Sequence, residues 1–379
     1  QYSVVISFQF SRVFRIWVIV LLMTGWPFYA NSRPVVFGYF GWWIDQDETL
    51  RALPSVDRIK YMEWKLGADG SIANKNGWPD VVGKVKKRAA ELGIPIDITL
   101  TLFSTSDFNA LFGSDLRVKR LTAALVAELE ADPAIRGLHL DVEIFSAVHP
   151  AAQLRYRAFV ANLSRIAKGM PIVRSTSIFL NHGAEKYLYD AETLLHVDHV
   201  VLQGYDSHST ESALVGPISP LTGSDAMTWE KMLAIARELK LFGPRILMGF
   251  PAYGYEWTVK PCNPRGKRMA PGKTTTFART PSHTVPSIVD RVLEHGAQYD
   301  PTTGSAHYQF NNPDGSCQVG WFEDWWTLQR KTDWILKEQL AGIAFFPLGY
   351  DGGDLVGMTA RRFRAIPEKS PEPIQLQAQ

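Results

Sequence analysis

The chain has 379 residues, of which 46% are hydrophobic and 21% charged, and its 40 Lys or Arg against 38 Asp or Glu give a formal net charge of +2. This composition is that of a globular protein, and because charges of both signs are interspersed, it gives no reason to expect a nucleic-acid partner. The 12 Trp, 13 Tyr and 20 Phe exceed what core packing requires, and such a surplus often lines sugar-binding clefts.

Residues 1–32 are predicted to be an export signal. Arg12 and Arg15 precede the apolar run Ile16–Met23, and Ala30-Asn31-Ser32 provides a small-x-small cleavage site. An uncleaved anchor is the alternative. We therefore expect an exported protein, periplasmic, extracellular or associated with the cell envelope, that makes no other membrane contact and is a monomer.

Short β-like runs alternate with amphipathic helices after this segment, which is typical of a parallel sheet with crossover helices. The expected strands are Val35–Tyr39, Arg58–Met62, Ile96–Leu102, Gly137–Asp141, Ile172–Ile178, His199–Gln203, Arg245–Phe250 and Gly342–Phe346. The expected helices are Asp80–Leu92, Val118–Leu129, Gln153–Lys168, Trp229–Leu241 and Trp326–Leu340. Eight strands with intervening helices predict an α/β fold, a (β/α)8 TIM barrel over residues 33–366.

The interval between the seventh and eighth strands is longer than the others and rich in Gly, Pro, Thr and Asn, so a small α+β insertion is expected at about residues 254–320. Cys262 and Cys317 both fall inside it, and export would permit a disulfide between them. No cluster of His and Cys at ligand spacing is present, so neither a zinc site nor a cofactor is expected. Residues 367–379 are predicted to be a disordered tail.

Residues 136–143, Arg-Gly-Leu-His-Leu-Asp-Val-Glu, end the fourth expected strand. Side chains alternate between the two faces of a strand, so His139, Asp141 and Glu143 share the face opposite to the intervening apolar residues. Buried carboxylates are costly unless they are paired or used, and barrel enzymes work at the carboxyl ends of their strands. A catalytic site is therefore favoured over a purely structural polar network.

Several segments of the chain resemble motifs of the family 18 glycoside hydrolases, the chitinase-like barrels. Gly137, Asp141 and Glu143 match the Asp-Gly-x-Asp-x-Asp-x-Glu signature of that family. Three further segments agree with it in order and spacing: Gln203-Gly204-Tyr205-Asp206, Gly249-Phe250-Pro251-Ala252-Tyr253-Gly254, and Gly342-Ile343-Ala344-Phe345-Phe346 followed by Asp351. The likeness extends over roughly residues 35–354.

This resemblance implies hydrolysis of glycans that contain β-linked N-acetylglucosamine, with Glu143 as the general acid and base. The acetamido oxygen of the substrate would act as the nucleophile, with retention of configuration, and Asp141 would orient the acetamido group. Tyr205 would donate a hydrogen bond to the acetamido oxygen. Two carboxylates on one strand face also repel, which can raise the pKa of Glu143.

The same resemblance suggests residues that contact the sugar. These substrate-binding candidates are Asp206, Gln203, His139, Tyr253, Phe346 and Trp42. Phe346 takes the place of the Trp that usually forms the floor of the sugar site, and it offers a smaller stacking face.

Arg136 and His139 occupy positions where the family usually has Asp. A histidine at position 139 could hydrogen-bond Asp141 and, as a cation, favour its ionised form, so a shifted pH optimum is one hypothesis. A non-catalytic carbohydrate-binding relative, a lectin, is the main alternative function. A glycosidase that uses Asp141 or Asp206 as a conventional nucleophile is a third.

Overall fold

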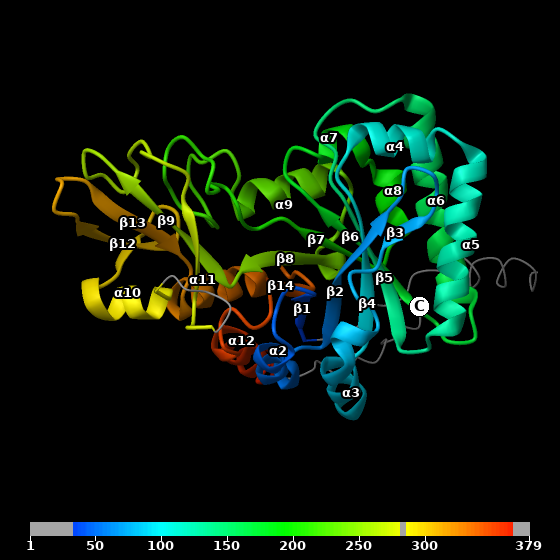
Figure 1. Cartoon of the computed structure of the whole chain (residues 1–379), viewed down its shortest axis with the longest axis horizontal. Coiled ribbons are helices and arrows are strands. Elements are labelled where there is room, and N and C mark those ends of the chain that lie inside the picture. Colours follow the sequence, from blue (N-terminus) through cyan, green and yellow to red (C-terminus); the bar gives the residue numbers. More distant parts are fainter. Residues whose placement is uncertain (1–32, 281–285, 367–379) are drawn as a thin grey trace, which may run out of the picture. The chain divides into compact units, whose positions relative to one another are not determined.

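The computed structural model describes residues 33–280 and 286–366, and those from Pro34 to Ile366 form one compact unit (Figure 1). The predicted export signal at residues 1–32 and the predicted tail at residues 367–379 lie outside the described residues. Within the described part of the chain, no helix is both long enough and apolar enough to cross a membrane.

The centre of the unit is a closed parallel barrel. The described residues contain eight barrel strands in the order β1-β14-β8-β7-β6-β5-β4-β2, and the pairing of β1 with β2 closes the sheet. Their bounds are β1 (Val35–Gly41), β2 (Arg58–Leu66), β4 (Ile96–Leu102), β5 (Ile135–Val142), β6 (Ser175–Leu180), β7 (His199–Leu202), β8 (Ile246–Pro251) and β14 (Gly342–Phe346). A short strand, β3 (Ile72–Asn74), pairs antiparallel with the end of β2.

Helices follow the barrel strands in sequence, which confirms the predicted (β/α)8 fold. The α-helices of this layer are α2 (Gln46–Ala52), α3 (Gly83–Leu92), α4 (Thr105–Phe112), α5 (Asp115–Ala131), α6 (Pro150–Gly169), α7 (Glu185–Leu188), α8 (Ala191–Leu195), α9 (Trp229–Glu238), α11 (Trp325–Lys337) and α12 (Asp354–Arg364). Three 3-10 turns accompany them, η1 (Leu53–Ser55), η2 (Asp80–Val82) and η3 (Gly243–Arg245).

Helix α5 illustrates how the sequence builds this layer. The Ser114 hydroxyl caps its first turn by accepting a hydrogen bond from the backbone N–H of Arg117. Leu121, Leu125 and Leu129 recur every four residues and are all buried, so one face of the helix packs against the core.

Some predicted boundaries were wrong. The strand expected at residues 172–178 begins at Ser175 and runs to Leu180, and Val173 is exposed instead of lying in the sheet. In α3 the buried positions are Val85 and Ala89, whereas Leu92 at its end is partly exposed. The short helices α2, α4, α7 and α8 and the terminal α12 were not predicted, since most offer too few residues for a clear helical period.

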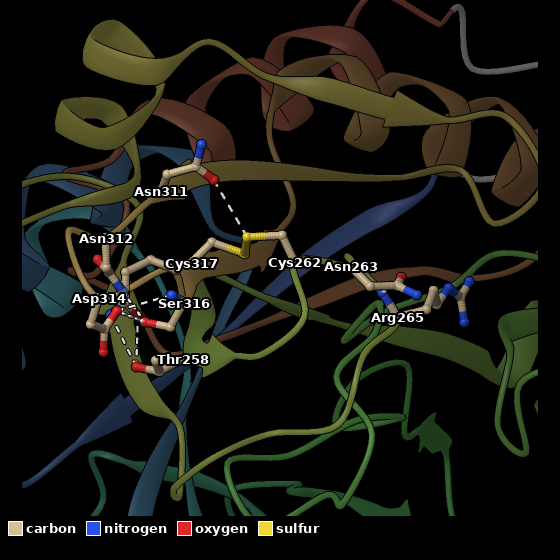
Figure 2. Close-up of a disulfide and its surroundings, with 10 residues drawn as sticks. Thr258, Cys262, Asn263, Arg265, Asn311, Asn312, Asp314, Ser316 and Cys317 are labelled. Carbon is tan, nitrogen blue, oxygen red and sulfur yellow. Dashed lines mark hydrogen bonds between the residues drawn. A yellow bond between two sulfur atoms is a disulfide. The ribbon is translucent and has the colours of Figure 1, made fainter.

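An insertion separates β8 from α11, whereas the predicted fold class placed it between the seventh strand and the last helix; α12 follows α11 and was not predicted. Its five antiparallel strands have the order β10-β9-β13-β12-β11. The insertion comprises β9 (Tyr253–Val259), β10 (Lys273–Thr276), α10 (Ile288–His295), β11 (Gln298–Asp300), β12 (Ser305–Asn311) and β13 (Cys317–Phe322). Figure 2 shows the disulfide between Cys262, in the loop after β9, and Cys317, the first residue of β13.

Candidate active site

A cavity of about 240 Å³ opens at the carboxyl ends of the barrel strands. Its lining consists of Tyr39, Met62, Phe103, Asp141, Glu143, Phe179, Asn181, Gln203, Tyr205, Asp206 and Phe346. Six of the predicted site residues are therefore brought together here from β5, β7 and β14 and the turns that follow them. A larger cavity of about 900 Å³ lies at the opposite end of the strands, where Arg58, Lys86 and Arg136 contribute to a mainly basic lining without a carboxylate pair.

Asp141 and Glu143 come from the end of β5. Asp141 is 6% exposed, and its Oδ1 atom has no hydrogen-bond partner within the described residues. The backbone N–H of Glu143 donates to Leu102 O of the neighbouring strand β4, and the Asn181 amide donates to Glu143 Oε2 over 2.6 Å. The alternation of β5 thus delivers two carboxyl groups to one cavity.

Burial determines the electrostatics of this pair. Burial is the main reason why the pKa of Asp141 lies well above its usual value, and the negative charge of Glu143 is the second. Burial also raises the pKa of Glu143, although a hydrogen bond with Asp141 works in the opposite direction. The pair of carboxyl groups therefore keeps a proton up to a higher pH than two exposed carboxylates would.

Three stacked aromatic rings form an apolar surface beside the carboxyl groups. Tyr205 packs nearly parallel to Phe346, with ring centroids 5.7 Å apart, and to Phe179 at 6.1 Å. Tyr205 is buried, and burial raises the pKa of its hydroxyl well above the usual value, so the hydroxyl is a permanent hydrogen-bond donor at physiological pH. Phe346 lines the cavity from the end of β14.

Asp206 is held by the insertion. It has a positive φ of 62°, a conformation that is uncommon outside Gly, and its Oδ1 accepts hydrogen bonds from Tyr253 at 2.7 Å and Tyr255 at 2.8 Å. Burial nevertheless raises the pKa of Asp206. Tyr253 thus contacts Asp206 and is absent from the cavity lining, so its position is that of a support for this carboxylate.

His139 does not hydrogen-bond Asp141, contrary to the predicted contact. It is fully buried, with Nε2 2.9 Å from the Tyr39 hydroxyl and Nδ1 2.8 Å from the Ser177 hydroxyl. Burial, and next the charge of Lys60, lower the pKa of His139 well below its usual value. The imidazole is therefore neutral, and the expectation of a cation beside Asp141 was wrong.

Arg136 and Trp42 also lie away from the cavity. Arg136, the second residue of β5, is exposed and lines the cavity at the opposite end of the barrel. It therefore lies away from both Asp141 and Glu143. Trp42 is 45% exposed and packs edge-on against Trp43, which in turn approaches Phe346 to 6.5 Å between ring centroids. Gln203 lines the cavity, and its Oε1 accepts a hydrogen bond from the backbone N–H of His182.

The family profile described as "Glycosyl hydrolases family 18" matches residues 35–351. The chain belongs to glycosyl hydrolases family 18. The matched residues include every barrel strand and the whole insertion, so the family assignment does not rest on the β5 signature alone.

Two curated relatives illustrate the range of similarity. The "Uncharacterized glycosylase YvbX" of Bacillus subtilis is 25% identical over 61% of this chain and 62% of its own length. The "Cortical fragment-lytic enzyme" of Bacillus anthracis is 21% identical over 78% of this chain and 65% of its own length. The chain therefore spans less than two thirds of either relative.

Solved structures share the fold at low sequence identity. The family 18 chitinase of Cycas revoluta, solved in complex with (GlcNAc)3, has a TM-score of 0.71 at 15% identity, with coverage of 87% of this chain and 99% of that one. The spore cortex-lytic enzyme SleL of Bacillus megaterium has a TM-score of 0.67 at 18% identity, covering 88% and 75%.

Five lining residues were not among the predicted catalytic and substrate-binding residues: Tyr39, Met62, Phe103, Phe179 and Asn181. Asn181 directly follows β6, and the prediction missed it because the expected strand ended at Ile178, two residues too early. Tyr39 did end an expected strand, so its position at the carboxyl edge was an available signal. Among the described residues, no group of three or more His, Cys, Asp or Glu side chains is arranged so that it could hold a metal ion.

Replacing Gly137 of the family 18 signature with Ala is expected to lower the free energy of unfolding by about 1–3 kcal/mol. A Cβ at this position would overlap the Asp97 carboxyl and the Ser175 hydroxyl, which lie on the two neighbouring strands. Urea denaturation measures the change. Gly83→Ala in α3 is the matched control, since nothing lies within 4 Å of its added Cβ, and equal losses in both variants would contradict the argument.

Proposed function

We propose that the chain is a glycosidase that hydrolyses β-linked glycans containing N-acetylglucosamine, by retaining, substrate-assisted catalysis. The observation that carries this proposal is the placement of two carboxyl groups, the buried Asp141 and the partly buried Glu143, in one cavity that Tyr205 also lines. Family 18 membership supports it, because this family belongs to the glycosidases in which the substrate itself supplies the nucleophile.

In the proposed reaction Glu143 protonates the glycosidic oxygen as the bond to the leaving sugar breaks. The raised pKa of Glu143 suits a group that must hold a proton in the free site, and the Asn181 amide keeps its carboxyl oriented. The acetamido oxygen of the substrate closes onto the anomeric carbon and forms a cyclic intermediate. Water then opens this ring, and Glu143 accepts the proton of that water.

Asp141 and Tyr205 would stabilise the cyclic intermediate. Once one proton of the carboxyl pair is on Glu143, ionised Asp141 can accept the acetamido N–H and offset the positive charge of the ring. The Tyr205 hydroxyl would donate to the acetamido oxygen and orient it. Phe346 and Phe179, on either side of Tyr205, offer apolar ring faces to a sugar.

Further substrate contacts are proposed in the cavity wall and on the surface beside it. Gln203 and Asp206 line the cavity and present polar groups to a sugar, whereas exposed Trp42 and its neighbour Trp43 could extend the binding surface outward. We place His139 and Tyr253 behind the lining, where they support Tyr39 and Asp206.

The natural substrate is proposed to be a cell-wall or chitin-like glycan met outside the cytoplasm. The relatives named for cortical fragments and spore cortex suggest a wall polymer, and the chitinase solved with (GlcNAc)3 suggests chitin oligomers. The disulfide fits an oxidising compartment. We propose that residues 33–366 act as one monomeric catalytic barrel, with the insertion as part of the site.

Steady-state assays on N-acetylglucosamine oligomers and on purified cell-wall glycan strands test this function. We expect turnover of at least one of them, with inhibition by a thiazoline mimic of the cyclic intermediate at concentrations about 10²-fold or more below KM. Turnover without thiazoline inhibition would instead indicate an enzyme nucleophile. Binding without turnover on every glycan would favour a carbohydrate-binding protein.

A further inference from the structure

The backbone carbonyl of Gly204 receives hydrogen bonds from two buried side chains. The Trp229 indole N–H donates to this oxygen over 2.8 Å, and the Ser219 hydroxyl donates to the same oxygen. Trp229 is the first residue of α9, Ser219 lies in the long loop between β7 and α9, and both side chains are fully buried. Neither of them lines the cavity, so both donors reach the site from behind its lining.

Gly204 directly precedes Tyr205, which lines the cavity. The Gly204 carbonyl and the Tyr205 N–H belong to one peptide unit, and a peptide unit is planar. Two donors that hold the carbonyl therefore also hold the plane from which the Tyr205 backbone starts. On the other side of Tyr205, the backbone N–H of Ser207 donates to Ile218 O over 3.0 Å. Residues 218 and 219 thus brace both flanks of the segment that carries Tyr205.

The backbones of Gly204 and Gly249 are in close contact behind Tyr205. A Cβ added to Gly204 would overlap Gly249 O, and a Cβ added to Gly249 would lie 2.9 Å from Cε1 of the Tyr205 ring. The ring therefore rests directly on β8, and it also stacks with Phe179 and Phe346. Because so little space surrounds the ring, a change in the plane of the Gly204 peptide is transmitted to it.

Trp229 is itself held in place from several sides. Its backbone N–H donates to Pro220 O over 3.0 Å. Its ring packs edge-on against Trp334 of α11, with 5.8 Å between the ring centroids, and Lys331 Nζ lies 5.7 Å from its centroid. One donor would already satisfy a buried carbonyl oxygen. The second donor therefore does more than satisfy the Gly204 oxygen, because two donors from a helix and a loop restrict the direction of this carbonyl.

We propose that Trp229 and Ser219 are positioning residues that hold Tyr205 in the cavity wall through the peptide of Gly204. The catalytic part of this inference rests on the proposed function, in which the Tyr205 hydroxyl meets the acetamido oxygen of the substrate. Misplacement of a contacting group by about 1 Å can cost about 10²-fold in rate. Loss of both donors should therefore lower kcat, although neither of the two side chains lines the cavity.

The placement of Tyr205 can be tested without any need for turnover. Carbon NMR of protein with 13C-labelled tyrosine rings, with Tyr205→Phe used to assign the signal, compares the wild type with the double variant Trp229→Phe/Ser219→Ala. We expect the Tyr205 signal to move or broaden in the double variant. An unchanged signal would overturn the proposal. This readout stands even if no glycan is hydrolysed, so its failure is distinct from failure of the proposed function.

Trp64→Phe is the matched control for the loss of an indole ring. Trp64 is also buried, its indole N–H has no hydrogen-bond partner among the described residues, and it does not line the cavity. This variant should leave the Tyr205 signal and kcat at their wild-type values. The same change of the Tyr205 signal in Trp64→Phe and in the double variant would overturn the proposal, since it would show that any lost indole disturbs Tyr205.

Steady-state kinetics test the catalytic consequence. We expect Trp229→Phe and Ser219→Ala each to lower kcat by about threefold to tenfold, because the other donor still holds the Gly204 oxygen. The double variant should lose about 10²-fold in kcat, with KM within about threefold of the wild-type value. A double variant that keeps the wild-type kcat would overturn the proposal.

The Tyr205→Phe background separates positioning from a merely structural role. If Trp229 and Ser219 act through the Tyr205 hydroxyl, the double change should cause no further loss of kcat once that hydroxyl is absent. An equal fold loss with and without the hydroxyl would mean that the two residues only support the fold, and it would overturn the proposal. Ser219→Ala alone, compared in both backgrounds, carries this test if the double variant does not fold.

Discussion

Glu143→Gln is expected to lower kcat by about 10³-fold on whichever glycan the wild type hydrolyses, with a small change in KM. The amide keeps the shape of the side chain and can still contact Asn181, which approaches the carboxyl to 2.6 Å, but it cannot transfer a proton to the leaving oxygen. General acid catalysis contributes typically 10²–10⁴-fold, and single-turnover kinetics would measure the loss at the chemical step.

The same variant should be more stable than the wild type at pH 7, which separates loss of chemistry from loss of folding. Because burial raises the pKa of Glu143, the native state holds its proton more tightly than the unfolded chain does. The stabilisation from that proton is complete below the unfolded value of about 4.3 and is lost as the pH rises through the native pKa.

A glutamine side chain does not ionise, so the variant avoids the cost of a charge at this position. Its Tm should therefore be higher by a few degrees at pH 7, which corresponds to about 1 kcal/mol, and this gain should fade near pH 4. Thermal denaturation at both pH values measures this difference. A variant that is inactive and also less stable at pH 7 would contradict the role of Glu143 as an acid whose ionised form is disfavoured in the folded protein.

Asp141→Asn is expected to reduce kcat by about 10²–10³-fold, the cost of removing one electrostatic contact to a developing charge. An amide oxygen can still accept a hydrogen bond, but it supplies no negative charge to a cationic ring. The affinity for the thiazoline mimic should therefore fall in parallel with kcat, and isothermal titration calorimetry would measure it.

Glu63→Gln is the matched control for this carboxyl-to-amide change. Glu63 is buried, accepts a hydrogen bond from Thr101 over 2.7 Å and raises the pKa of Asp141 by its charge, yet it does not line the cavity. Its replacement should leave kcat within about threefold of the wild-type value, within the usual uncertainty of single contacts. Equal losses in the two variants would mean that Asp141 acts only through the general field of the barrel.

The barrel could be predicted from the sequence because its strands are apolar runs bounded by turns. The β5 motif was informative for the same reason, since alternation along one strand places Asp141 and Glu143 on one face whatever the rest of the chain does. Both carboxyl groups line the cavity. Local patterns of this kind require no knowledge of distant contacts.

The surroundings of His139 could not be predicted in this way. Its two partners, Tyr39 and Ser177, are 100 and 38 residues away in the chain, so their contacts depend on the barrel register. That register aligns Ser177 with His139 across β5 and β6. The family comparison suggested a bond to Asp141, whereas the barrel provides other partners that leave the imidazole neutral.

The two tyrosines that hold Asp206 connect the site to the first strand of the insertion. Tyr253 and Tyr255 belong to β9, the first strand of the insertion, ahead of Cys262 and of every other strand in the inserted sheet. The portion of the insertion after Val259 therefore makes no hydrogen bond to Asp206 in the described structure. Loops beyond Val259 can therefore vary in sequence while Asp206 keeps its two hydroxyl donors, provided that β10 and β13 still pair with β9.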